Sequence, residues 1–109
     1  MPQPFFVMRR SSEDQVTVEL GGECDASTLD ELNEVLRDVL AERRNRVVID
    51  LAQVTFVDSL TLGALTAAAK QVRAGGGSFR VVRAAALEVR RAFEITGLDK
   101  YLLVPREND

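Results

Sequence analysis

The chain has 109 residues, of which 46% are apolar and 28% charged, and its formal net charge is −3 at pH 7. A chain of this length can bury one core without metals or disulfides, so we expect residues 1–109 to form a single domain. It contains no histidine and one cysteine, Cys24. This composition excludes Ser–His and Cys–His nucleophile pairs, an internal disulfide and a cysteine-based metal cluster.

The distribution of charge and hydropathy argues against two kinds of partner. Residues 1–58 carry 6 basic and 12 acidic side chains, and residues 59–109 carry 8 basic and 5 acidic ones. Neither part contains a basic arm that would follow a phosphate backbone, so we expect no direct nucleic-acid binding. No apolar run approaches the roughly 20 residues that cross a bilayer, and residues 1–10 lack a signal-peptide core. We therefore expect a cytoplasmic protein without membrane insertion.

Two extended segments are expected first along the chain. Residues 5–8 form a short apolar run, and residues 15–20 alternate between apolar and polar side chains. The polar residues 11–14 between them suit a turn, and Gly21 and Gly22 end the second segment. The pattern predicts an N-terminal hairpin whose first strand lies at an edge of the sheet.

Residues 28–44 are expected to form the first helix, because their apolar side chains recur at helical spacing. Asp25, Ser27 and Thr28 are candidates to cap its amino end. Its last turn carries two arginines, where positive charge interacts favourably with the helix dipole. The apolar stripe comprises Leu29, Leu32, Val35, Leu36, Val39 and Leu40.

A buried strand and a second helix are expected next. Residues 47–51 (VVIDL) are a compact apolar run typical of a central strand. We interpret residues 52–57 as a connection. Residues 59–74 then have apolar side chains at helical spacing, and the glycines at 75–77 end this helix.

The last part of the chain predicts a strand over 79–82, a helix over 84–96, a short strand over 101–104 and a frayed tail over 106–109. Strands and helices thus alternate after the hairpin. This order predicts an α/β fold with a mixed, mostly parallel sheet of about five strands and helices packed on it.

The start of the second predicted helix is the first place where chemistry is expected. Asp58 and Ser59 follow a strand, and functional sites of open α/β sheets lie at the carboxyl ends of strands. An aspartate here is also a common helix cap. A catalytic serine is disfavoured, because it lacks a histidine base and neither Lys70 nor Lys100 has a recognisable Ser–Lys spacing.

Other constellations carry weaker signals. Asp25 and Asp58 both follow strands and would lie near Ser59 if those strands are adjacent, but two carboxylates alone are weak evidence for a cation. The glycines at 75–77 precede a strand rather than a helix, which disfavours a phosphate-binding loop. Cys24 is best interpreted as a small buried apolar residue. We assign no catalytic residue, cofactor or metal.

Three segments in the same order and spacing resemble the bacterial anti-sigma factor antagonists built on a single STAS domain. Residues 20–25 (LGGECD) resemble the segment before that family's first helix. Residues 47–51 followed by 54–59 (VTFVDS) resemble its strand-to-phosphosite passage, and 89–98 (VRRAFEITGL) its third-helix signature. The resemblance spans about residues 7–104 and implies a STAS-like fold.

The resemblance also implies a functional site. In this family the serine directly after the aspartate is phosphorylated, which implies phosphorylation of Ser59. Thr61 stands where the family usually has glycine, and we expect its branched side chain to narrow access to Ser59. The alternative is that Thr61 packs inward. The implied partner-binding residues are Asp25, Asp58, Ser59, Leu60, Thr61 and Leu62.

The function implied is that of a partner-switching regulator. Unphosphorylated, such a protein binds an anti-sigma factor that is also a serine kinase, and phosphorylation from Mg-ATP releases it. A phosphatase resets the switch. The chain is then a substrate and ligand rather than an enzyme. Whether it forms a homodimer is left open. A helix amino end favours a phosphate, which is consistent with a switch at Ser59.

Two other functions stay open. STAS-type subunits also accompany ABC transporter ATPases and occur in stress-sensing assemblies, which would keep the fold and change the partner. The other candidate is a small nucleotide-binding or hydrolytic protein. The lack of histidine and of a glycine-rich phosphate loop disfavours this second alternative.

Overall fold

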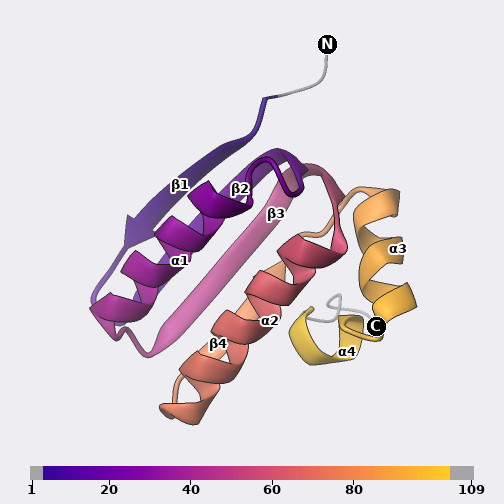
Figure 1. The fold of residues 1–109 in the computed structure, drawn as a ribbon. Coiled ribbons are helices and arrows are strands. Elements are labelled where there is room, and N and C mark those ends of the chain that lie inside the picture. Colours follow the sequence, from indigo (N-terminus) through magenta and orange to yellow (C-terminus); the bar gives the residue numbers. More distant parts are fainter. Residues whose placement is uncertain (1–3, 104–109) are drawn as a thin grey trace.

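The computed structural model describes residues 4–103, which form one four-stranded sheet with helices packed against it (Figure 1). The strand order is β1-β2-β3-β4, in which β1 is antiparallel to β2 and the other neighbours are parallel. The elements are β1 (Phe6–Ser11), β2 (Gln15–Cys24), α1 (Leu29–Glu42), β3 (Arg46–Val57), α2 (Ser59–Ala74), β4 (Ser78–Val82), α3 (Leu87–Thr96) and α4 (Asp99–Leu102).

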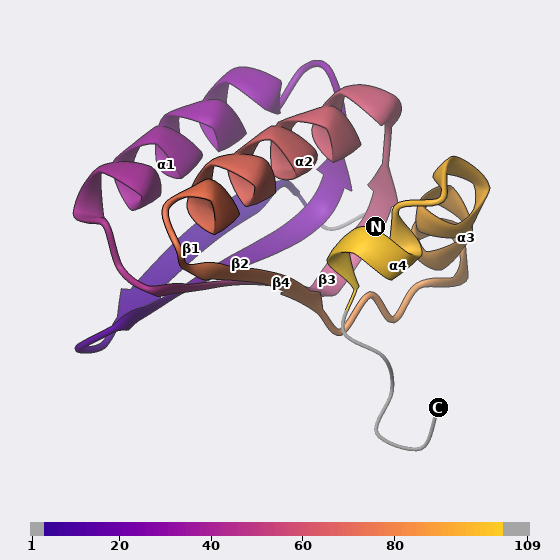
Figure 2. The same ribbon diagram turned by 90° about the horizontal axis from the view of Figure 1, so that it is seen from below.

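The core lies between the sheet and its helices, mainly α1 and α2, and α3 and α4 add Val89, Phe93 and Leu102 to it. α1 and α2 lie side by side over one face of the sheet, while α3 and α4 lie together at its side (Figure 2). Alternate residues of β2, β3 and β4 face these helices and are buried. The apolar stripe of α1 packs on them through Leu32, Leu36 and Val39. The expected hairpin and the mixed, mostly parallel α/β fold are confirmed.

The central strands are longer than the sequence pattern predicts. β3 continues through residues 52–57, contrary to the interpretation of this segment as a connection, because Val54 and Val57 are buried and the pairing with β2 persists. β2 likewise continues past its two glycines to Cys24. Its pairing with β3 shifts register between Glu19 and Gly21 and again between Gly22 and Glu23. These irregularities accommodate the glycines without ending the strand.

The predicted last strand is wrong for its first residues. Tyr101 and Leu102 belong to the short helix α4, and Leu103 forms a single parallel bridge with Val81. Helical geometry is favoured here because it buries Leu102 in the core. The guanidinium of Arg73 also lies 4.5 Å from the centroid of the Tyr101 ring. The described sheet therefore has four strands, and the predicted tail at 106–109 lies outside the described residues.

Two helix boundaries also differ from the sequence-based prediction. α1 ends at Glu42, because Arg43 adopts a left-handed conformation with φ of 55° and caps the helix. α3 begins at Leu87 rather than at residue 84, because Ala86 has an extended backbone and forms the cap position of the helix. A positive φ interrupts a right-handed helix, so Arg43 ends α1, whereas the extended Ala86 sets the start of α3.

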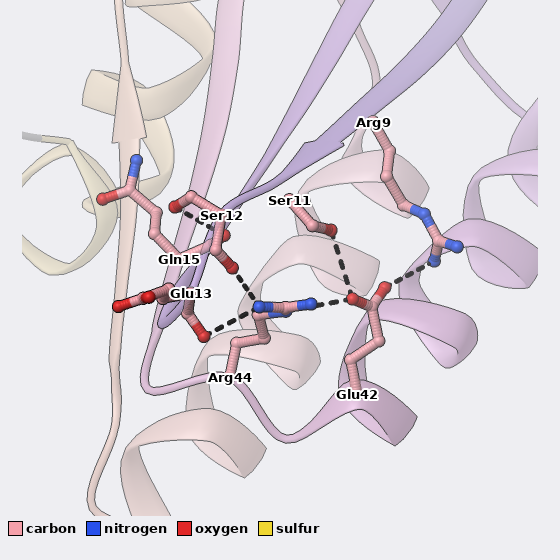
Figure 3. Close-up of polar contacts among 7 residues, drawn as sticks. All are labelled: Arg9, Ser11, Ser12, Glu13, Gln15, Glu42 and Arg44. Carbon is pink, nitrogen blue, oxygen red and sulfur yellow. Dashed lines mark hydrogen bonds and ion pairs between the residues drawn. The ribbon is translucent and has the colours of Figure 1, made fainter.

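Arg44 anchors the hairpin turn to the end of α1 (Figure 3). Its guanidinium donates to the backbone carbonyls of Ser12 and Glu13, the latter at 2.8 Å, and to the carboxylate of Glu42 at 3.2 Å. Glu42 also pairs with Arg9 at 2.8 Å. These contacts lie at the end of the sheet opposite to the carboxyl ends of β2 and β3, so they stabilise the fold away from the candidate site.

Candidate functional site

The candidate site lies where β2 and β3 end side by side. Their last paired residues are Cys24 and Val57, and Asp25 and Asp58 follow directly. The strands are adjacent as the sequence-based argument required, so the turn after β2 and the start of α2 are neighbours (Figure 1). The carboxyl ends of parallel strands are the usual place for a binding site in an open α/β sheet.

Asp58 caps α2. Its backbone is extended, with φ of −103° and ψ of 178°, and its carboxylate accepts a hydrogen bond from the Thr61 N–H at 2.8 Å. The structural part of the sequence-based interpretation is thus confirmed. Ser59 is the first residue of the helix and its side chain is exposed. The geometry therefore presents a hydroxyl to solvent at a helix amino end.

Asp25 does not cap α1, contrary to one sequence-based interpretation. Its Oδ1 accepts from the Ser27 N–H at 2.9 Å and from the Ser27 hydroxyl at 2.6 Å. Thr28 occupies the cap position, but its hydroxyl bonds to the backbone of Asp25 instead of to a helix N–H. Residues 25–28, which we call the Asp25 turn, thus close on themselves. The Ser27 hydroxyl, then its N–H, lowers the pKa of Asp25.

The six predicted partner-binding residues divide into exposed and buried groups. Leu60 exposes 51% of its surface, whereas Thr61 exposes 1% and Leu62 exposes 3%. Thr61 points inward and its hydroxyl donates to the Cys24 carbonyl at 3.0 Å. The expectation that Thr61 narrows access to Ser59 is therefore wrong, and the inward-packing alternative holds. Because buried side chains cannot contact a partner directly, we leave Thr61 and Leu62 out of the contact surface.

Sequence reasoning missed two exposed residues beside the site. Glu23 and Phe56 are paired across β2 and β3, and both are exposed. No periodic pattern in residues 52–57 reveals Phe56, because Val54 and Val57 are both buried while Thr55 and Phe56 are both exposed, which breaks the alternation of a strand. We define the Ser59 surface as the exposed or partly exposed residues at this end of the sheet: Glu23, Asp25, Phe56, Asp58, Ser59 and Leu60.

Cys24 supplies structure rather than thiol chemistry. It is fully buried, and burial, followed by the nearby Asp25 and Asp58 carboxylates, raises the pKa of its thiol to about 12. A thiol that stays protonated at neutral pH is a poor nucleophile and a poor metal ligand. Among residues 4–103, no cluster of three or more His, Cys, Asp or Glu residues is arranged to hold a metal ion. The interpretation of Cys24 as a buried apolar residue is confirmed.

Comparison with known proteins identifies the family. A family model described as "Mlab, STAS domain" matches residues 7–105. The chain belongs to the STAS domain family. An anti-sigma-B factor antagonist of Staphylococcus epidermidis is 33% identical to this STAS domain over 86 residues, which cover 79% of each chain. The name of this relative describes a regulatory role.

Solved structures give the same assignment. An anti-sigma factor antagonist from Mycobacterium paratuberculosis matches with a TM-score of 0.83 and 29% identity, covering 97% of this STAS domain and 90% of that chain. The anti-sigma factor antagonist SpoIIAA in its unphosphorylated form has a TM-score of 0.76 at 17% identity, covering 96% and 91%. Bacillus SpoIIAA in the phosphorylated form has a TM-score of 0.69 at 16% identity, covering 96% of this STAS domain and 95% of that chain. At these lower identities the likeness to SpoIIAA shows the shared fold.

The resemblance to anti-sigma factor antagonists is confirmed by these comparisons. The phosphorylation of Ser59 and the role of its neighbours in binding stay predictions. Within residues 4–103 no helix is both long and apolar enough to cross a membrane.

Proposed function

We propose that this STAS domain is an anti-sigma factor antagonist that binds an anti-sigma factor serine kinase through the Ser59 surface. Phosphorylation of Ser59 releases it, and a phosphatase restores it. The observation that carries the proposal is the exposed Ser59 hydroxyl at the amino end of α2, beside the exposed Leu60. In this function the single domain acts in the cytoplasm as a ligand and substrate rather than as an enzyme.

The electrostatics of the Ser59 surface support release by phosphorylation. Glu23, Asp25 and Asp58 make this surface acidic, and the four ion pairs of the described residues lie elsewhere. The Thr61 N–H at the helix amino end is already bonded to the Asp58 carboxylate. A phosphate on Ser59 therefore adds about −1.5 to −2 charges next to the Asp58 carboxylate.

The apolar neighbours explain how that charge acts. Phe56 exposes 40% of its surface and Leu60 exposes 51%. A partner that covers Leu60, the residue next to Ser59, removes water from around Ser59, and a phosphate dianion there must lose hydration. The proposed switch therefore works at the contact itself, because the bound complex becomes unfavourable while the fold is unchanged.

Intact-mass analysis tests the modification. The purified domain is incubated with Mg-ATP and the serine-kinase anti-sigma factors encoded by the same genome. We expect one phosphate on the wild type and none on Ser59→Ala. Thr55→Ala is the matched control, because Thr55 is an exposed hydroxyl residue three positions from Asp58 on β3 and should leave labelling intact. A phosphate that persists on Ser59→Ala would contradict the proposal.

A pull-down with the unphosphorylated domain identifies the partner class. Recovery of an anti-sigma factor kinase supports the proposal. Recovery of a transporter ATPase, with no kinase, would overturn it in favour of an accessory STAS subunit. Turnover of ATP or GTP by the purified domain would instead indicate an enzyme.

A further inference from the structure

The feature that the proposed function does not use is the buried hydroxyl of Thr61. Thr61 Oγ1 donates to the carbonyl oxygen of Cys24 at 3.0 Å, a contact between residues 37 positions apart in sequence. Neither residue exposes more than 1% of its surface. Water therefore has little access to replace this hydrogen bond if the hydroxyl is removed.

The Cys24 carbonyl is a shared acceptor that connects the end of β2 to the start of α2. It also accepts the Asp58 N–H at 3.1 Å. The Asp58 carboxylate in turn accepts the Thr61 N–H at 2.8 Å. Asp58 and Thr61 are thus bonded to each other and to the same carbonyl, so the two residues that flank Ser59 and Leu60 are fixed relative to the last residue of β2.

The ladder between β2 and β3 is irregular at this end of β2, and it finishes with Glu23 paired to Phe56 and Cys24 paired to Val57. The pairing shifts register twice before Cys24, and Gly22 has φ of 78°. The Asp25 turn begins with the next residue, and its side-chain hydrogen bonds join residues within 25–28. The bonds from the Asp58 N–H and the Thr61 hydroxyl to the Cys24 carbonyl therefore link the last paired residue before the turn directly to the start of α2.

We propose that Thr61 is a positioning residue whose hydroxyl holds the Asp25 turn in place beside Ser59 before any partner binds. The consequence for binding rests on the proposed function, whereas the mechanical link does not. A partner that meets an ordered surface does not have to order the turn itself, which avoids an entropic cost of association. A glycine at position 61 would have no hydroxyl and would leave the link unmade.

Amide hydrogen exchange of the isolated domain tests the mechanical link. Thr61→Val keeps the side-chain shape and removes the hydroxyl, and Thr61→Ser restores it. Thr66→Val is the matched control, because the Thr66 hydroxyl bonds within α2 to the Leu62 carbonyl at 2.7 Å. We expect Thr61→Val to speed exchange of the Ser27 and Asp58 amides roughly 2- to 10-fold, the factor that one net hydrogen bond represents.

The expected pattern is local and reversible. Thr61→Ser should return both exchange rates to those of the wild type, and Thr66→Val should leave the Ser27 amide unchanged. Unchanged Ser27 exchange in a folded Thr61→Val would overturn the proposal. An equal increase in Thr66→Val would also overturn it, because the effect would then reflect the general stability of the domain.

Kinetics of Ser59 phosphorylation test the consequence for the partner. If Thr61 presents the surface, Thr61→Val raises the KM of the kinase for the domain several-fold and leaves kcat near the wild-type value. A change in kcat alone, with KM unchanged, would overturn the positioning role in binding. If the wild type is not phosphorylated at all, the proposed function fails, and the exchange experiment still decides whether Thr61 holds the turn.

Discussion

At the scale of single residues, the Ser27 hydroxyl is the largest cause of the lowered pKa of Asp25. We predict that Ser27→Ala raises the pKa of the Asp25 carboxyl towards its usual value of 3.8, while the remaining N–H donor at position 27 keeps it below that value. Carboxyl chemical shifts followed by NMR during a pH titration measure this. An unchanged pKa in Ser27→Ala would show that the hydroxyl does not hold the carboxylate.

The sign of the linked stability follows from the direction of that shift. Because the folded-state pKa of Asp25 is depressed, its contribution to stability is fully present above the unfolded value. The contribution is lost as the pH falls through the folded-state pKa. The destabilisation of Ser27→Ala relative to wild type should therefore shrink in acid.

At the scale of elements, the carboxyl end of α1 stores conformational strain. Arg43 has φ of 55°, its side chain is exposed, and its N–H bonds to the Leu40 carbonyl. A residue with a Cβ is disfavoured in this left-handed conformation, whereas glycine is not. We predict that Arg43→Gly raises the free energy of unfolding by about 0.5–1 kcal/mol.

Urea denaturation measures this change, and Arg43→Ala is its control. Alanine removes the same charge and the same long side chain but keeps the Cβ, so it should not stabilise the domain. Equal stabilisation by glycine and alanine would attribute the effect to charge rather than to backbone strain.

Sequence periodicity predicted the elements whose burial is regular. The alternation in β2 and the apolar stripe of α1 each reflect one buried face, so a local pattern contains the information. The predictions for residues 52–57 and 101–103 were wrong because the burial of these segments is set by neighbours in the sheet and by α2. There, tertiary contacts decide between strand, loop and helix.

The candidate site shows the same division between local and long-range information. The cap at Asp58 was predictable, because an N-cap involves residues three positions apart. The orientation of Thr61 was not, because its hydroxyl partner Cys24 lies on a different strand. The exposure of Phe56 was missed because the alternation of β3 breaks there, with Thr55 and Phe56 both exposed between the buried Val54 and Val57.

At the scale of the whole molecule, the proposed switch acts through charge at one end of the sheet of an α/β domain. α1 and α2 cover one face, and the carboxyl ends of β2 and β3 place the Ser59 surface at the end of that layer (Figure 2). Since the phosphate acts at the contact, the fold should be the same in both states. Backbone NMR shifts of the carboxyl-terminal halves of β1 and α1, which lie at the other end of the sheet, should therefore not change on phosphorylation.

The central claim is that one phosphate on Ser59 controls binding of the kinase partner. Isothermal titration calorimetry tests it with the unphosphorylated and phosphorylated domain, and with Ser59→Asp against Ser59→Asn, which differ in charge at nearly equal size. The account predicts that phosphorylation weakens binding by at least about 100-fold, or ~2.7 kcal/mol, and that aspartate weakens it more than asparagine. Equal affinities of the phosphorylated and unphosphorylated domain, with unchanged circular dichroism, would contradict it.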